Sequence, residues 1–107
     1  MNYRTDKYGN RLSILGFGCM RFQRKMGQID LEEMEQELLC AVENGVNYFD
    51  TAYVYHNEES ESVVGEALSG ELRDKVMIAT KLPMWKVEKA EDMMAILDEQ
   101  LEKLQVE

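Results

Sequence analysis

The sequence predicts an α/β protein in which an N-terminal β-hairpin is followed by three β/α units. Short apolar runs alternate with longer segments whose apolar residues recur at helical spacing. This alternation is typical of a parallel sheet covered by helices. The connections between the apolar runs are also long enough to hold the right-handed helical crossovers that parallel strands require.

The first 28 residues predict the hairpin, one strand and a loop. Tyr8-Gly9-Asn10 is a turn signal between two short polar–apolar segments, so residues 3–13 are expected to form a β-hairpin. The run "ILGFG" at residues 14–18 predicts a short buried strand. Residues 19–28, which include three basic side chains, are expected to form a loop.

The first helix is predicted by its two ends. Asp30 can cap the free amides, Glu33 completes a pattern like a capping box, and Gly45 suits the left-handed position after the last turn. Between them, one apolar face recurs at helical spacing and comprises Leu31, Met34, Leu38, Ala41 and Val42.

Two more strands and two more helices complete the predicted order. Strands are expected at residues 46–50 and 75–80. A helix is expected at residues 60–70, with Ser60 as a possible cap, Val63, Val64, Ala67 and Leu68 toward the core, and Gly70 at its end. The final helix is expected to bury the residues that recur at helical spacing, which are Met93, Met94, Leu97, Leu101 and Leu104.

Composition narrows the class of function. The 107 residues suffice for one small domain, and the net charge of −9 argues against non-specific binding to nucleic acid or to an anionic membrane. No apolar run approaches the length of a membrane span, and the polar N-terminus does not resemble a signal peptide. Cys19 and Cys40 lack metal-ligand spacing, so no metal site is predicted, and two reduced thiols favour a cytoplasmic protein.

Three parallel strands with helices over one face would leave the other face and both edges of the sheet uncovered. The sequence also stops near Glu107, where the final helix would lead into a fourth strand. We therefore expect residues 1–107 to be the N-terminal portion of a single larger domain, and the open edges could support self-association.

Candidate catalytic groups follow the predicted strands. In parallel β/α proteins, ligands bind at the carboxyl ends of the strands, and here those ends would gather Asp50, Tyr53, Tyr55, His56 and Lys81. A tyrosine hydroxyl has a pKa of about 10, so a proton donor of this type benefits from a cationic lysine that favours the phenolate. A carboxylate beside the lysine would keep it charged and in place.

Each of these residues also has a structural interpretation. The aspartate and lysine could form a simple ion pair at the rim, and a loop tyrosine could only pack. Tyr53 is predicted to pack, and His56 is predicted to be a solvated loop histidine. Residues 16–18, "GFG", are a weak dinucleotide signal, because the third glycine is absent and no helix follows directly.

Taken together, several of these stretches resemble the N-terminal part of an aldo-keto reductase. They are the opening hairpin, "LGFGCMRF", "GVNYFDTAYVYHNEESESVVGEALSG" and "IATKL", and the run from Asp50 to Tyr55 is the strongest motif. The resemblance covers essentially the whole chain. It implies an incomplete (β/α)₈ TIM barrel. The sequence of residues 3–22 is also similar to that of bacterial members with a C-terminal iron-sulfur segment, which would lie outside this chain.

The resemblance also implies site residues and a reaction. Tyr55 would be the proton donor, Lys81 its activator and Asp50 the partner of the lysine, in an NADPH-dependent reduction of a small aldehyde or ketone. Asp50 together with Gly18, Cys19 and Met20 would lie near the nicotinamide. The family's catalytic histidine follows the fourth strand, and most contacts to the cofactor lie in the last two strands, so this chain alone is expected to be inactive.

Two alternatives stay open at this point. A short half-barrel could act as an interaction module that oligomerises through its sheet edges. A protein of the same fold could also bind a nicotinamide cofactor as a sensor without much turnover.

Overall fold

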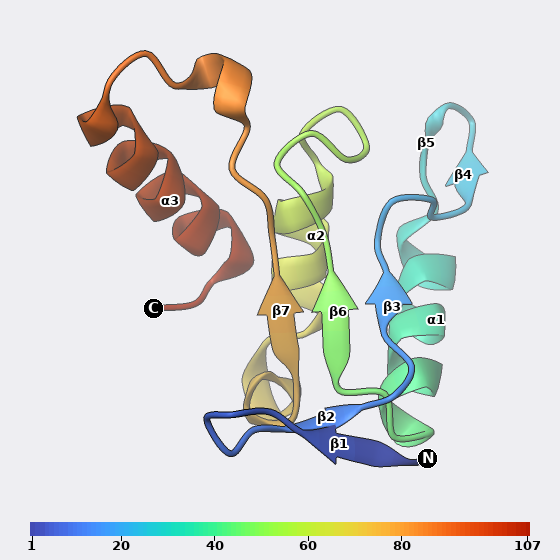
Figure 1. Ribbon diagram of the computed structural model, residues 1–107. Coiled ribbons are helices and arrows are strands. Elements are labelled where there is room, and N and C mark those ends of the chain that lie inside the picture. Colours follow the sequence, from blue (N-terminus) through green and yellow to red (C-terminus); the bar gives the residue numbers. More distant parts are fainter.

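The computed structural model describes residues 1–107 and has a three-stranded parallel sheet at its centre. Strands β3 (Phe17–Gly18), β6 (Tyr48–Asp50) and β7 (Met77–Ala79) lie side by side in that order. The register places Gly18 opposite Asp50, and Asp50 opposite Ala79. Figure 1 shows the three strands pointing in one direction, so their carboxyl ends share one edge.

Helices α1 (Leu31–Glu43) and α2 (Ser60–Ala67) cover one face of the sheet, whereas α3 (Ala90–Leu104) lies beyond β7 (Figure 1). Apolar burial between the sheet and these helices forms the core, whose fully buried members include Phe49, Met34, Leu38, Leu68 and Val64. Two short 3₁₀ segments, Gly70–Lys75 and Met84–Lys86, flank β7. No helix combines the length and the apolar character that crossing a bilayer requires.

The predicted hairpin is confirmed and lies at the amino end of the sheet. β1 (Tyr3–Thr5) pairs antiparallel with β2 (Arg11–Ser13). The Tyr3 hydroxyl donates to Gly45 O at 3.0 Å, and Ser13 N donates to Asn47 Oδ1 at 2.8 Å. These bonds attach the hairpin to the segment that leads into β6, on the side opposite the candidate site.

The predicted N-cap at Asp30 and the left-handed Gly45 of α1 are confirmed, but the pattern like a capping box is not formed, because Asp30 N donates to Gln23 O at 2.8 Å instead of to Glu33. Asp30 Oδ1 accepts a hydrogen bond from Glu33 N at 3.2 Å, and Gly45 has a φ of 93° directly after the C-cap Asn44. Met34 and Leu38 are buried as expected, but Leu31 is exposed. The apolar face of α1 is therefore narrower than its sequence pattern indicated.

Two expectations for the N-terminal third are wrong. The predicted strand at residues 14–18 is reduced to Phe17–Gly18, because Ile14 and Leu15 stay exposed where the chain leaves the hairpin. The predicted loop at residues 19–28 contains most of a second hairpin, in which β4 (Arg24–Lys25) pairs with β5 (Gln28–Ile29). Met26 and Gly27 both have positive φ values, which suits a two-residue hairpin turn.

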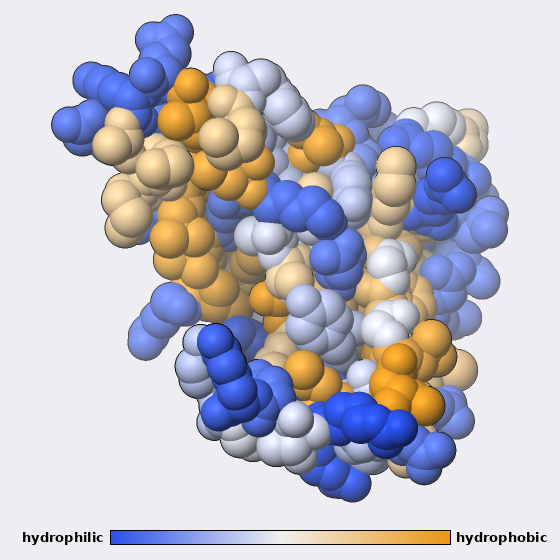
Figure 2. Space-filling view, viewed as in Figure 1, coloured by the Kyte–Doolittle hydropathy of each residue, from blue (hydrophilic) through white to orange (hydrophobic).

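The expectations for α2 and α3 also need correction. Glu59 is the N-cap of α2, and the hydroxyl of Ser60 is instead buried in contact with the strand ends. α3 buries Ile96, Gln100 and Leu104, so the prediction is confirmed at Leu104, whereas Leu101 is only half-buried. Met93, Met94 and Leu97 are exposed, and Figure 2 shows apolar surface over α3. The helix turns this way because its polar side chains bond to the strand ends.

Candidate active site

The candidate site lies at the edge of the sheet where the three parallel strands end (Figure 1). Asp50 is the last residue of β6, and Lys81 comes two residues after the end of β7. Tyr55 lies in the loop between β6 and α2. The topology therefore brings these three residues together from two neighbouring strand ends, as the sequence predicted.

The ammonium group of Lys81 connects this cluster. Its Nζ donates to Asp50 Oδ2 at 2.6 Å and to Tyr55 Oη at 3.0 Å. It also donates to the backbone oxygen of Thr51 at 2.8 Å, a contact that the sequence did not reveal because any residue supplies a carbonyl. Since the tyrosine oxygen accepts from Lys81, its own hydroxyl hydrogen can point toward an external acceptor.

The electrostatics of Lys81 keep it positively charged. Burial lowers the pKa of Lys81, but its hydrogen bonds to Asp50 and Tyr55 outweigh burial and hold the pKa above its usual value of 10.5. The side chains of Lys81 and Asp50 are 48% and 41% exposed, so solvent screens the pair and it contributes little to stability. The pair therefore orients the ammonium group rather than holding the fold together.

The loop that carries Tyr55 has an unusual backbone. His56, Asn57 and Glu58 have φ values of 52°, 54° and 70°, so three consecutive non-glycine residues are left-handed. Each such residue costs on the order of 1 kcal/mol, and surrounding contacts must offset that cost. Local hydrogen bonds contribute, because Tyr55 N donates to Ala52 O and Ser60 N donates to Tyr55 O.

The prediction of a solvated loop histidine is wrong. His56 is half-buried and stacks on Phe22 with ring centroids 5.4 Å apart. Its Nε2 accepts from Phe22 N at 3.0 Å, and its Nδ1 lies 3.2 Å from Arg24 Nη2. Sequence reasoning missed these contacts because Phe22 and Arg24 are more than 30 residues away along the chain.

The residues predicted to lie near a nicotinamide differ in their surroundings. Gly18 faces open space where a side chain would project, and Met20 is 52% exposed. Cys19 is buried, its N donates to Asp50 O at 2.8 Å, and its O accepts from Ser60 Oγ at 3.0 Å. Burial and the charge of Asp50 raise the pKa of the Cys19 thiol to about 12, so it is no nucleophile near neutral pH.

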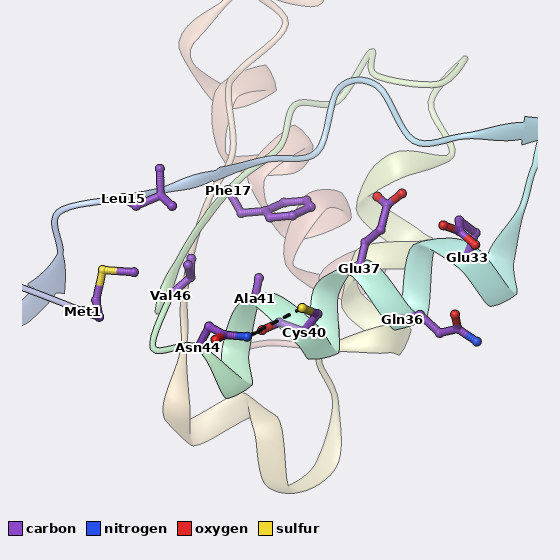
Figure 3. A pocket seen from close by; sticks show the side chains of 10 residues that line it. All are labelled: Met1, Leu15, Phe17, Glu33, Gln36, Glu37, Cys40, Ala41, Asn44 and Val46. Carbon is purple, nitrogen blue, oxygen red and sulfur yellow. Dashed lines mark hydrogen bonds between the residues drawn. The ribbon is translucent and has the colours of Figure 1, made fainter.

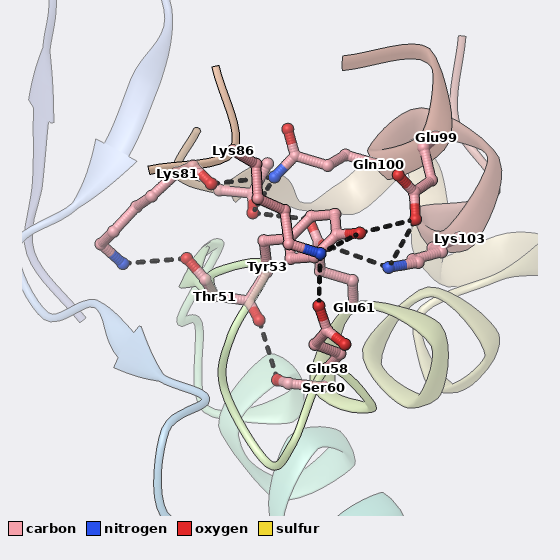
Figure 4. Close-up of polar contacts among 11 residues, drawn as sticks. Thr51, Tyr53, Glu58, Ser60, Glu61, Lys81, Lys86, Glu99, Gln100 and Lys103 are labelled. Carbon is pink, nitrogen blue, oxygen red and sulfur yellow. Dashed lines mark hydrogen bonds and ion pairs between the residues drawn. The ribbon is translucent and has the colours of Figure 1, made fainter. Parts of the chain in front are cut away.

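A buried polar network lies behind the cluster and reaches Lys81 through its backbone (Figure 4). Gln100 Nε2 donates to Lys81 O at 2.9 Å, and Thr80 Oγ1 donates to Glu61 Oε2 at 2.7 Å. Glu61 is fully buried, and its Oε1 has no hydrogen-bond partner but lies 4.0 Å from Lys103 Nζ. The network thus connects α2 and α3 to the end of β7.

Tyr53 packs into this network, as expected. Its hydroxyl donates to Glu99 Oε1 at 2.8 Å, and the ammonium groups of Lys86 and Lys103 lie 4.5 and 4.0 Å from its ring centroid (Figure 4). A sequence signal for the network did exist. Glu61 precedes Val64 by three residues and Gln100 follows Ile96 by four, so both polar residues fall on the buried stripes of their helices.

Tyr55 lies between two hollows of different character. One, of about 270 Å³, is mostly apolar and is lined by Ala52, Tyr53, Val54, Tyr55, Lys81, Leu82, Pro83 and Trp85. The other, of about 440 Å³, is lined by Met20, Arg21, Phe22, Arg24, Val54, Tyr55, His56 and Asn57. A larger apolar groove of about 600 Å³ between β3 and α1 contains none of the predicted site residues (Figure 3).

The family follows from a comparison with known proteins. The model of the aldo/keto reductase family matches residues 14–107. This chain belongs to the aldo/keto reductase family. A probable voltage-gated potassium channel subunit beta of Arabidopsis thaliana is 35% identical over 85 residues, which are 77% of this chain and 25% of that relative. A probable aldo-keto reductase 1 of Glycine max is 39% identical over 75 residues, or 68% of this chain and 21% of the relative.

Solved aldo-keto reductases share the fold. An aldo/keto reductase of Klebsiella pneumoniae in complex with NADP and acetate is 28% identical, with a TM-score of 0.76 over 92% of this chain and 34% of its own. The predicted fold of a hairpin and three β/α units from a TIM barrel is confirmed. The chain spans about a quarter of the curated relatives it matches and about a third of that solved chain.

Proposed function

We propose that the whole protein is an NADPH-dependent oxidoreductase that reduces a small aldehyde or ketone, with Tyr55 as the proton donor. The observation that carries this proposal is the placement of one ammonium group, Lys81 Nζ, within hydrogen-bonding distance of both Asp50 and Tyr55. Membership of the aldo/keto reductase family supports the reaction class.

Each residue of the cluster has a distinct role in this proposal. The hydroxyl of Tyr55 donates its proton to the carbonyl oxygen of the substrate as negative charge develops there. Lys81 stabilises the phenolate that Tyr55 becomes, because its ammonium group already donates to the phenol oxygen. Asp50 and the carbonyl of Thr51 hold the ammonium group of Lys81 toward Tyr55.

The residues at the end of β3 fit one end of a nicotinamide cofactor. Gly18 leaves open space beside Asp50, and Met20 offers exposed apolar surface in the same pocket as Tyr55. When bound, the reduced nicotinamide supplies the hydride that goes to the carbonyl carbon. Cys19 contributes through position alone, since its side chain and both backbone polar groups are engaged inside the protein.

We infer that residues 1–107 by themselves give no turnover. Lys81 and Asp50 are both more than two-fifths exposed, and water would compete for the charges that the reaction needs. The resemblance that suggested an iron-sulfur segment outside these residues stays a prediction.

Replacement of Tyr55 in the whole protein tests the proposal. Tyr55→Phe is expected to lower kcat by roughly 10²–10⁴-fold, the usual contribution of a positioned proton donor, with little change in NADPH affinity. Tyr8→Phe, in the exposed hairpin turn, is the matched control and is expected to retain full activity.

Turnover, cofactor binding and oligomeric state together separate the alternatives. A turnover rate that Tyr55→Phe leaves unchanged would remove Tyr55 from the chemistry. Retained cofactor binding with no turnover in the unmodified protein would favour a sensor. A defined oligomer of residues 1–107 without cofactor affinity would favour an interaction module.

A further inference from the structure

The pocket on the Arg24 side of Tyr55 is lined by groups that donate hydrogen bonds. Arg21, Arg24, His56 and Asn57 contribute nitrogen-bearing side chains, and no carboxylate lines the pocket. This composition is unusual for a chain with a net charge of −9. Glu58, which follows Asn57, is bound to Lys86 at 3.0 Å, and Glu59 lines a separate hollow. The lining of this pocket is therefore basic within an acidic protein, and Glu59 is the carboxylate whose charge acts on the pKa of His56.

Arg24 is held in place more firmly than its exposure suggests. Its Nη1 donates to Gly27 O at 2.9 Å, across the turn between β4 and β5. Its Nη2 lies 3.2 Å from His56 Nδ1. The bond from Nη1 to Gly27 O preorganises the guanidinium group, so less conformational entropy would be lost when Nη2 binds a ligand.

The two ring nitrogens of His56 each face a hydrogen-bond donor, namely Phe22 N and Arg24 Nη2, but a neutral ring can accept only one of these bonds. Nε2 accepts from Phe22 N, so in the neutral ring the single proton resides on Nδ1. That N–H then points at the guanidinium of Arg24, which is also a donor. Burial and the charge of Arg24 lower the pKa of His56 against the opposing charge of Glu59, which favours the neutral ring. An oxyanion between the two groups would accept from both.

We propose that Arg24 and His56 form an oxyanion site beside Tyr55, which binds a carboxylate or phosphate group through Arg24 Nη2 and His56 Nδ1. Bidentate recognition by two fixed donors suits the two oxygens of such a group. Arg21 and Asn57 line the same pocket and add further donors around the anion.

This site would select the substrate, an inference that rests on the proposed function. A carbonyl group at Tyr55 would lie between the oxyanion site and the apolar hollow that Trp85 and Leu82 line. Carbonyl compounds that carry a carboxylate or phosphate would thus be preferred over neutral ones. The other source of the same chemistry is a phosphate group of the cofactor.

Binding is tested without turnover by titrating the ¹⁵N-labelled whole protein with sodium acetate and with inorganic phosphate at constant ionic strength. We expect saturable shifts of the His56 ring nitrogens and of the Phe22 amide, with neutral acetamide causing none. Before titration, the long-range ¹H–¹⁵N spectrum is expected to show a protonated Nδ1. A bare Nδ1 would overturn the proposal, because Arg24 would then simply donate to it.

Matched variants decide whether the site is specific. Arg24→Gln is expected to weaken acetate binding about tenfold or more, the usual effect of losing a charge-assisted hydrogen bond. Lys25→Gln removes the same charge from the same hairpin but lines no part of the pocket, so its affinity should be unchanged. Equal losses in both variants, or no saturation in the unmodified chain, would overturn the site. Should Arg24→Gln fail to fold, Arg24→Lys replaces it, because lysine keeps the charge and removes the planar fork. Acetate binding is then expected to weaken, and unchanged affinity would overturn the bidentate site.

The source of the anion is decided in the whole protein with a paired substrate set, an aldehyde that ends in a carboxylate and its primary amide. If the substrate supplies the anion, Arg24→Gln raises KM about tenfold for the acid and leaves the amide unchanged. If the cofactor supplies it, the Kd of NADPH rises and both substrates respond alike. If neither the KM for the acid nor the Kd of NADPH changes, the oxyanion site has no part in the reaction and this link is overturned.

The oxyanion site and the proposed function can fail separately. A whole protein that reduces no carbonyl would refute the proposed function, whereas the acetate titration would still decide whether the oxyanion site exists.

Discussion

α1 and α3 pack in opposite ways. α1 buries the apolar side chains of Met34 and Leu38 in the main core. α3 contributes Leu104 to that core, but Glu99 and Gln100 make polar contacts near the strand ends, and Lys103 lies beside Glu61 of α2 (Figure 4). α1 is attached by apolar burial, whereas α3 combines the burial of Ile96 and Leu104 with directional bonds.

The difference between α1 and α3 shows that one kind of contact supplies stability and another fixes the positions of polar atoms. Apolar burial is non-directional and scales with area, so the α1 side can supply stability without specifying where any polar atom lies. Hydrogen bonds specify distance and direction but add only about 1 kcal/mol each to net stability. The α3 side is therefore suited to hold Lys81 in place, because Gln100 bonds directly to its backbone oxygen.

The largest effect is expected on the α1 side. Leu38→Ala removes a side chain that is 1% exposed and should lower the free energy of unfolding by about 2–5 kcal/mol. Urea denaturation measures the change. Leu39→Ala, the next residue on the same helix and 44% exposed, should cost far less. Equal losses would show that α1 is not packed as described.

An intermediate effect is expected where α2 approaches α3. A Cβ atom at Gly65 would lie 2.5 Å from Lys103 O and 2.6 Å from Leu104 Cα, which are backbone atoms that cannot yield easily. Gly65→Ala should therefore lower stability by about 1–3 kcal/mol, although alanine favours a helix over glycine by about 1 kcal/mol. Thermal and urea melts measure it. A gain of stability would mean that α3 does not lie this close to α2.

The smallest change in stability is expected at Gln100, where the effect on the site should be most specific. Gln100→Leu removes the donor to the oxygen of Lys81, an exposed residue where water can replace it, and should cost about 0.5–1.5 kcal/mol. As Lys81 loosens from Asp50 and Tyr55, its raised pKa should fall toward 10.5. An NMR titration of the Lys81 Cε resonance measures this shift. Gln36→Leu, on the exposed face of α1, should leave that pKa unchanged, and an equal shift there would refute the positioning role.

Local patterns predicted the elements better than their contacts. The cap at Asp30 and the left-handed Gly45 follow from short-range chemistry, so the ends of α1 were predictable. The face that α3 buries was not, because its orientation depends on bonds from Glu99 and Gln100 to residues 19 to 46 positions away. Met93 and Leu97 had the stronger apolar pattern and nevertheless stay exposed.

The sequence by itself determined the order of elements, the parallel sheet and the gathering of Asp50, Tyr55 and Lys81 at one edge. These follow from hydrophobic period and from the rule that parallel strands end together, both of which are read along the chain. Only the tertiary structure decided that Arg24 meets His56, that Cys19 is buried, and that Gln100 bonds to Lys81 O. Such contacts depend on distances of a few ångströms between residues far apart in the sequence, which no local pattern encodes.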